Sequence, residues 1–307
     1  MSPDTKDDKY EKALQQNRND KVVIFLGFLL CCFFALVYHF HNDLSSSPLK
    51  TTVSDTVSAI TIPIGELEQN VQTFDRAVRE LKAQIPIFEI NAEAQTAAKQ
   101  LQEATRLLLA ARYGAREPYH VKVTLEFQPS IPNFDNEGSS GEFTIEMAPT
   151  TLLPHSVFTF LEIARQWKSG AFHRIAGHVL QVMVRTKTNI QHLAFQEYSP
   201  LYPHKKMTCG YAGRPSGPAF YVSILDNSKN HGPGSQQKEN PYEADSNFGT
   251  VIQGFDETVM RITKVPGTGF LSDPKLHVLI KEMIIMIPNE LGIYEEWKEH
   301  SRETAGE

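Results

Sequence analysis

The sequence predicts a mainly β domain that follows a transmembrane helix and a helical stem. Three observations support this fold class: an uncharged apolar run near the N-terminus, a heptad-like spacing of apolar residues after it, and a period of two in apolar residues from about residue 118. A single core stops growing at roughly 250–300 residues, so a chain of 307 residues fits one large domain with an appendage.

The composition excludes several classes of protein. With 41% hydrophobic and 21% charged residues, most of the chain can bury a core. A net charge of −6 disfavours a nucleic-acid partner, which needs a basic face to neutralise phosphates. Three cysteines without a CxxC pair, and the absence of HExxH, disfavour a disulfide scaffold and a metal site.

The apolar run predicts a membrane anchor over residues 22–40. These 19 residues contain no Asp, Glu, Lys or Arg, and as a helix they are nearly as long as the ~30 Å hydrocarbon layer is thick. A cleaved signal peptide has a shorter apolar core and a shorter segment before it, which favours a retained anchor. Cleavage near Ser45, Ser46 and Ser47 is the alternative.

The distribution of basic residues predicts a single-pass type II orientation. Lys6, Lys9, Lys12, Arg18 and Lys21 precede the span, whereas Lys50 is the only Lys or Arg in the 20 residues after it. Because the more basic flank stays in the cytoplasm, residues 1–21 are expected there as a tail. The C-terminal part is then lumenal, in the endoplasmic reticulum or Golgi, or extracellular. Residues 41–61 are rich in Ser and Thr and are interpreted as a spacer.

Residues 62–114 are predicted to form a stem of two helices. In the first, apolar residues recur three and four apart, at Ile64, Leu67, Val71, Phe74, Val78, Leu81 and Ile85. In the second, the smaller seam is Ala94, Ala97, Leu101, Ala104, Leu108 and Ala111, and Gly114 ends the helix. Two arrangements are open: residues 64–85 join copies of the chain into a homo-oligomeric coiled coil, or the two helices fold as a hairpin on each other or on the next domain.

The domain over residues 118–289 is predicted to be rich in strands. Val121, Val123, Leu125 and Phe127 share one strand face, as do Phe143, Ile145 and Met147. HSVFTFLEIARQW predicts a helix, and further strands are expected in FHRIAGHVLQVMVR, MTCGYAG, AFYVSIL, NFGTVI and LHVLIKEMIIMI. The polar segment 226–245 is interpreted as a surface loop. Gly267-Thr268-Gly269 predicts a turn, and the tail, residues 290–307, one or two amphipathic helical turns.

Several strings in this domain resemble the cyclophilins, a family of peptidyl-prolyl cis-trans isomerases. Phe172-His173-Arg174-Ile175 followed by Gln181 is similar to the family's FHRI strand with one residue deleted. Three further strings resemble family strings and occur in the family's order: APTTLLPHSVFTFLEI, Ala219-Phe220-Tyr221-Val222 and Asn247-Phe248-Gly249-Thr250-Val251-Ile252-Gln253-Gly254-Phe255-Asp256. The resemblance covers about residues 118–289 and implies an eight-stranded antiparallel barrel with two helices.

The resemblance also implies the site residues. Arg174 is the expected catalytic residue, because a guanidinium beside the prolyl nitrogen stabilises the lone pair that localises there when the amide bond twists. Phe172, His173, Gln181, Phe220 and Tyr221 are the expected substrate-binding residues. In an extended strand Phe220 and Tyr221 point to opposite faces, so only one of them can line a pocket. No cofactor is expected.

The function expected is a membrane-tethered prolyl isomerase acting on Pro-containing segments of secretory-pathway proteins. The alternative is a weak or inactive cyclophilin-like module that binds such segments on an oligomeric stem. Departures from the family pattern favour it: Gly217-Pro218-Ala219 replaces Gly-Ser-Gln, and Gln181-Val182-Met183-Val184 replaces Q-x-G-D. A lumenal glycosyltransferase fits the layout, but the chain contains no Asp-x-Asp pair to hold its metal ion.

Overall fold

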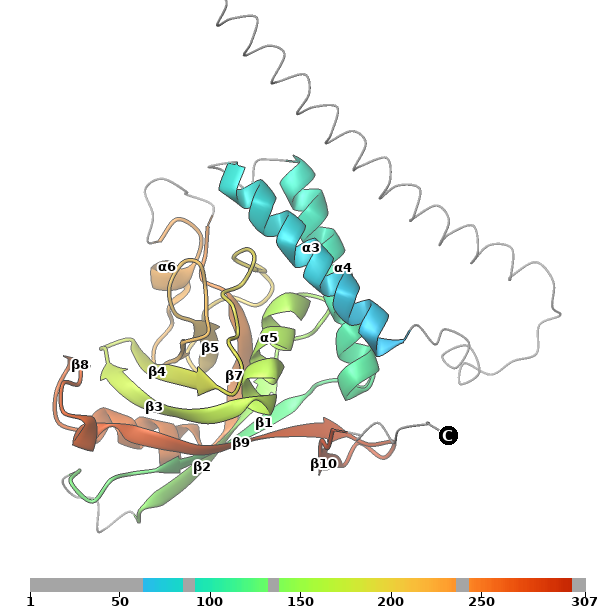
Figure 1. Ribbon diagram of the computed structural model, residues 1–307. Helices are drawn as coiled ribbons and strands as arrows, with labels where there is room; N and C mark the ends of the chain where they lie inside the picture. The colour runs from blue at the N-terminus through green and yellow to red at the C-terminus, as the bar shows by residue number, and fades with distance from the viewer. Residues whose placement is uncertain (1–62, 85–91, 132–137, 236–242, 300–307) are drawn as a thin grey trace, which may run out of the picture. The chain divides into compact units, whose positions relative to one another are not determined.

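The computed structural model describes residues 63–84, 92–131, 138–235 and 243–299 (Figure 1). All of these described residues belong to one compact unit. The predicted tail 1–21, transmembrane segment 22–40 and spacer 41–61 lie outside the described residues and stay predictions. Within the described ranges, no helix is both long enough and apolar enough to cross a membrane.

The described residues contain helices and ten strands. The α-helices are α3 (Ile64–Gln84), α4 (Ala92–Tyr113), α5 (Pro154–Arg165) and α6 (Ser228–His231). The first five strands are β1 (His120–Glu126), β2 (Ser140–Met147), β3 (Trp167–Ile175), β4 (Val179–Thr186) and β5 (Thr208–Tyr211). The others are β6 (Phe220–Ser223), β7 (Asn247–Gln253), β8 (Gly269–Phe270), β9 (Val278–Pro288) and β10 (Tyr294–Glu296). Short helical turns η3 (Phe255–Val259), η4 (Met260–Lys264) and η5 (Pro274–Leu276) lie between β7 and β9.

All strands except β8 and β10 form a closed barrel. Its order is β9-β1-β2-β7-β5-β6-β4-β3, and β3 pairs with β9 to close the ring. Every pairing in the ring is antiparallel. Strand β8 extends from β3, and β10 pairs with the end of β9. The eight-stranded antiparallel barrel implied by the sequence resemblance is therefore present.

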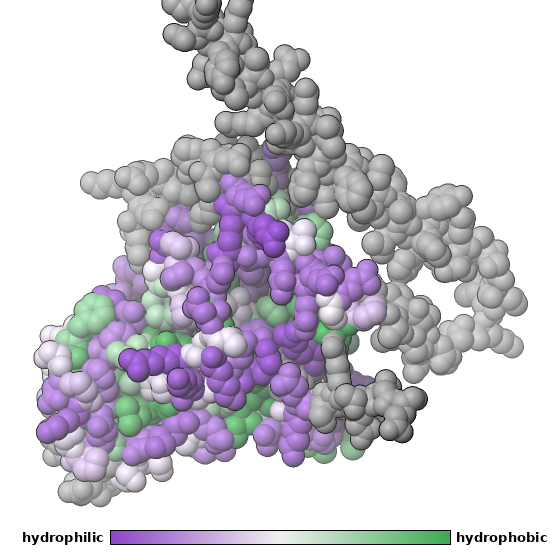
Figure 2. Space-filling view, in the orientation of Figure 1, coloured by the Kyte–Doolittle hydropathy of each residue, from purple (hydrophilic) through white to green (hydrophobic). Residues whose placement is uncertain are grey.

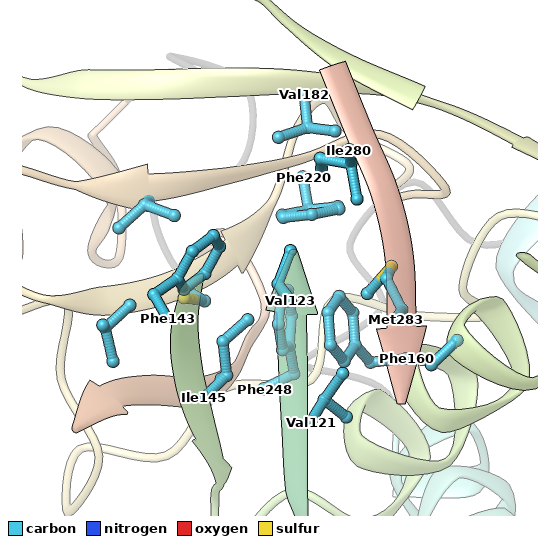
Figure 3. Packing of buried hydrophobic residues seen from close by; sticks show 14 of the residues in the cluster. Val121, Val123, Phe143, Ile145, Phe160, Val182, Phe220, Phe248, Ile280 and Met283 are labelled. Carbon is cyan, nitrogen blue, oxygen red and sulfur yellow. The ribbon is translucent and has the colours of Figure 1, made fainter. Parts of the chain in front are cut away.

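Alternating side chains fill the barrel interior. The two predicted strand faces, at Val121, Val123, Leu125 and Phe127 and at Phe143, Ile145 and Met147, are all at most 2% exposed. Helix α5 adds Phe160, which stacks on Phe248 at 3.9 Å and meets Phe220 edge to face at 5.2 Å (Figure 3). Such aromatic pairs add about 0.5–1.5 kcal/mol each beyond the area they bury.

Helices α3 and α4 form the hairpin that was one of the two arrangements open for the stem. Leu67, Val71 and Val78 of α3 pack in one cluster with the alanine and leucine seam of α4. This face of α3 is covered by the chain itself, and the described structure offers no support for an oligomeric seam over residues 64–85. Leu109 and Tyr113 of α4 lie in the barrel's own core cluster, so the stem is not a separate body.

A buried carboxyl group, that of Glu197, connects the hairpin to the barrel. Helix α5 begins without a capping side chain of its own. Instead, Glu197 accepts hydrogen bonds from the backbone N–H groups of His155, at 3.2 Å, and Ser156, at 2.6 Å. The same carboxylate accepts from Gln102 of α4 at 2.8 Å. A carboxylate at a helix N-terminus satisfies free N–H groups and the positive end of the helix dipole, so Glu197 stabilises α5 and fixes α4 beside it.

Two predicted helical features are corrected. Ala111 is exposed, because the 3.6-residue period of the helix turns Leu109 and Tyr113 inward in its place. The tail beyond residue 290 is not helical where it is described, since β10 uses the free edge of β9 after a turn at Gly292. Trp297 then donates a hydrogen bond to the Arg112 carbonyl at 3.1 Å.

Candidate functional site

A row of four side chains crosses the outer face of the barrel. The strand register places Phe270 beside Arg174, Arg174 beside Gln181, and Gln181 beside Tyr221. Residues directly opposite each other on paired strands point to the same face of a sheet. The structure thus brings together three of the predicted site residues, Arg174, Gln181 and Tyr221, and adds Phe270.

The Arg174 guanidinium is held between two neighbours. Its Nη1 donates a hydrogen bond to Oε1 of Gln181 at 2.8 Å, and its central carbon lies 5.0 Å from the centre of the Phe270 ring. Arg174 and Gln181 are both half-buried, so the cation is fixed but still meets solvent. A positioned cation of this kind can donate to an acceptor placed on the outer face without first reorganising.

Phe172 and Phe220 face the interior instead. Both are fully buried in the core cluster, and Figure 3 shows Phe220 among core side chains. The expectation that they contact substrate is corrected, because neither reaches the outer face. For Phe172 the cause is a β-bulge: the register shifts between Phe172 and Arg174, so residues two apart point to opposite faces. For Phe220 and Tyr221 the predicted alternation is confirmed.

His173 is the extra residue of this bulge. It is half-buried, and its ring lies 5.4 Å from the ring of Phe270 and 6.3 Å from that of His277. Burial and the neighbouring His277 lower the pKa of His173. His173 therefore sits beside the row as a neutral ring at pH 7, in packing contact with Phe270.

Tyr221 is covered by other side chains and does not offer an exposed apolar surface to a prolyl ring. It is only 2% exposed, and its hydroxyl lies 3.3 Å from Nδ1 of His204 and 3.3 Å from Oδ2 of Asp245. Burial, and then Asp245, raise the pKa of Tyr221 well above its ordinary value, so the phenol stays protonated. The proton is consequently available for the hydrogen bond to Asp245.

Asp245 is the centre of a buried polar group, called here the Asp245 cluster: Arg214, His231, His204, Tyr221 and Asp245. Arg214 Nε donates to Asp245 Oδ1 at 2.8 Å, and His231 Nδ1 lies 2.5 Å from Oδ2. The side chains of Arg214, His231 and Asp245 are 4%, 7% and 3% exposed. His204 Nε2 lies 3.0 Å from the Asp245 carbonyl oxygen, and burial lowers its pKa to about 4.

Sequence reasoning missed the Asp245 cluster. The segment 226–245 was expected to be exposed, yet Asn227, His231, Glu243 and Asp245 are all at most 6% exposed. These residues come from polar loops, and no periodic pattern joins Arg214 to Asp245, 31 positions apart. The hydrophilic composition of a loop says nothing of whether its side chains pair with one another. Neither in this cluster nor at any other place in the described ranges do three His, Cys, Asp or Glu residues form a metal-binding group.

The absence of a side chain at Gly210 leaves room for the Tyr221 ring. A Cβ atom at Gly210 would lie 2.6 Å from the Tyr221 hydroxyl oxygen and 2.8 Å from the adjacent ring carbon. Gly210→Ala is therefore expected to displace Tyr221 and to lower the free energy of unfolding by about 1–3 kcal/mol, measured in urea. Gly177→Ala is the control, since a Cβ there meets nothing within 4 Å. Equal stability of the two variants would contradict this account.

Comparisons with known proteins show a likeness to solved structures. No protein-family model and no curated protein matches the sequence. Among solved structures, the chain is similar to a cyclophilin type peptidyl-prolyl cis-trans isomerase of Cryptosporidium parvum, at 16% sequence identity and a TM-score of 0.40. The match covers 55% of this chain and 98% of that chain.

Proposed function

We propose that the chain is a cyclophilin-like peptidyl-prolyl cis-trans isomerase with Arg174 as its catalytic residue. The observation that carries the proposal is the Arg174 guanidinium, which Gln181 and Phe270 hold on the outer face of the barrel. The sequence string around it, Phe172 to Ile175 with Gln181, resembles the corresponding string of cyclophilins. The proposal extends to the expected setting: a type II membrane protein whose barrel meets Pro-containing segments of secretory-pathway proteins.

The proposed chemistry requires one group that binds the twisted amide better than the planar one. Rotation about a peptide bond has a barrier of ~18–20 kcal/mol, because the nitrogen lone pair is delocalised into the carbonyl. When the bond twists, the lone pair localises on the prolyl nitrogen and becomes an acceptor. An Arg174 N–H directed at that nitrogen stabilises the transition state more than the ground state, which is the condition for catalysis. Gln181 acts as a positioning residue by fixing the guanidinium.

The test is prolyl isomerisation of Ala-Pro peptides, followed by exchange NMR with the 307-residue chain. Arg174→Ala is expected to lower the catalysed rate by about 10²-fold or more, the usual loss when one preorganised donor is removed. Arg174→Lys keeps the charge but not the planar fork and is expected to recover only part of the rate. Arg116→Ala, a 57% exposed arginine in an ion pair with Glu290, is the matched control. A rate unaffected by Arg174→Ala would remove Arg174 from the mechanism.

A second function, peptide binding without useful turnover, is favoured by the burial of Tyr221. The ring expected to support the prolyl group is only 2% exposed and bonded into the Asp245 cluster. A peptide held beside Arg174 without an exposed apolar surface under its prolyl ring would be bound but isomerised slowly. The same NMR experiment separates the two functions: peptide-dependent shifts of signals near Arg174, without enhanced exchange, would support the binding module.

A further inference from the structure

Phe270 is an exposed aromatic residue that the barrel fixes beside Arg174. It is 66% exposed, so it contributes little to the core. Its neighbour Leu271 is nearly buried, and the Leu271 N–H donates to the His173 carbonyl at 2.8 Å. Phe270 itself pairs with Arg174 in the short strand β8. The backbone on both sides of the ring is thus anchored, while the ring remains at the surface.

A glycine turn leads into this position. Gly267 and Gly269 have φ angles of 109° and 73°, in the left-handed region that favours glycine. Where a turn was predicted, the chain bends at Thr268, and Gly269 already begins β8, which pairs Phe270 with the edge of β3. At the end of the barrel where β8 lies, Figure 2 shows hydrophobic residues among hydrophilic ones. An apolar ring held in water beside a fixed cation is a feature that folding of the core does not require.

We propose that Phe270 selects the substrate of the Arg174 site: Pro-containing segments in which an aromatic or aliphatic residue directly precedes the proline. This inference rests on the proposed function, because it assumes that the prolyl nitrogen faces Arg174. Neighbouring strands lie about 4.8 Å apart, and consecutive Cα atoms are 3.8 Å apart. A residue next to the proline therefore comes within reach of a ring one strand away from Arg174.

The contacts around Phe270 indicate which side chains it can accept. One face of the Phe270 ring is directed at the Arg174 cation, whose central carbon lies 5.0 Å from the ring centre. The rest of the ring offers an apolar surface to a ligand. His173, 5.4 Å away, adds a second flat ring. An aromatic or aliphatic side chain gains contact area against these rings. A lysine in the same place would meet the positive charge of Arg174 and would be disfavoured.

The experiment measures binding and isomerisation of four peptides that differ only at the residue before proline: Phe-Pro, Leu-Pro, Ala-Pro and Lys-Pro. NMR titration of the 307-residue chain gives the dissociation constants, and exchange spectra give the rates. We expect Phe-Pro to bind about five- to tenfold more tightly than Ala-Pro, and Lys-Pro less tightly than Ala-Pro. In Phe270→Ala the Phe-Pro to Ala-Pro ratio should approach one, and Phe270→Leu should retain part of it.

The ratio distinguishes selection by Phe270 from a general loss of the site, because a change in Arg174 affects both peptides alike. Leu291→Ala removes an 82% exposed side chain in the turn before β10 and should leave the ratio unchanged. A wild-type preference that survives in Phe270→Ala, or no preference in the wild type, would overturn the inference while leaving the isomerase intact. If the ratio of Phe-Pro to Ala-Pro binding depends on Phe270 but no exchange is catalysed, the inference is supported and the proposed isomerase activity is contradicted. Absence of binding by all four peptides would overturn both.

Discussion

Replacing Asp245 by alanine is expected to lower the free energy of unfolding by about 3–5 kcal/mol. Asp245 pairs with Arg214 Nε at 2.8 Å and with His231 Nδ1 at 2.5 Å, and all three side chains are at most 7% exposed. Removing one partner of a buried pair leaves the other charge without compensation in a poorly solvated place, which costs more than the pair itself contributes. Urea unfolding followed by circular dichroism, with linear extrapolation to water, gives the difference.

Asp226→Ala is the matched control for Asp245→Ala. Asp226 also pairs with a cation, Lys205, at 2.7 Å, but the two side chains are 54% and 59% exposed. An exposed pair contributes only about 0–1 kcal/mol, so this variant should unfold almost as the wild type does. If both aspartate variants lost the same small amount, the Asp245 cluster would not be a structural element of the loops around Tyr221.

The Asp245 variants also bear on the candidate site. Because Asp245 holds the Tyr221 hydroxyl and the loops above it, its loss should expose the Tyr221 ring beside Gln181. The two proposed functions then respond differently. If the chain is an isomerase whose prolyl site is covered by this cluster, Asp245→Ala should expose apolar surface next to Arg174. If the chain is a binding module that depends on the intact loops, the same variant should bind peptides less tightly. The choice between them therefore depends on Asp245 and its partners Arg214 and His231, which no cyclophilin-like string in the sequence contains.

The fold was predictable because its signals are local. Alternation of apolar residues places Val121, Val123 and Phe143 inside the barrel, and all three are buried there. The period of 3.5 in the stem predicted two helices but left their partner open, because the same seam can pack on another copy or on the same chain. Only the three-dimensional structure shows that Leu67 and Val78 pack against α4.

The candidate site was predictable only in part, for two physical reasons. First, a one-residue bulge reverses which side chains face outward, so Phe172 and Arg174 cannot be assigned to one face from their spacing. Second, cross-strand neighbours such as Arg174 and Phe270 are far apart in sequence and join only through the register. Arg174 and Gln181 were found because they belong to one hairpin with a known string, whereas Phe270 belongs to none.

Mild acid is expected to destabilise the protein through two buried histidines. Burial lowers the pKa of both His155 and His204 to about 4, from an ordinary value of 6.5. The folded state therefore binds these protons more weakly than the unfolded chain, so the stability is complete above pH 6.5 and is lost as the pH falls from 6.5 towards 4. At pH 5 each histidine accounts for about 2 kcal/mol, since one pKa unit corresponds to 1.36 kcal/mol. The two histidines together contribute about 4 kcal/mol to the difference in unfolding free energy between pH 7.5 and pH 5, which urea unfolding measures.

The neighbours of each histidine show why it stays neutral. The His155 ring lies 3.9 Å from one carboxylate, that of Asp75, but Asp75 is already bound by Arg79 at 2.6 Å. His204 meets the Asp245 carbonyl and the Tyr221 hydroxyl, while Arg214 already pairs with the Asp245 carboxylate. Neither imidazole would gain a free counter-ion on protonation. The raised pKa of Glu197, which burial causes, acts in the opposite direction and makes the measured loss smaller.

Single substitutions identify the histidines responsible. His155→Gln or His204→Gln should remove about half of the difference in unfolding free energy between pH 7.5 and pH 5, even if the variant is less stable at both. His192→Gln, at an exposed position, controls for the loss of a histidine as such. A pH difference that is the same in all three variants would mean that other groups, and not these buried imidazoles, make the folded state sensitive to acid.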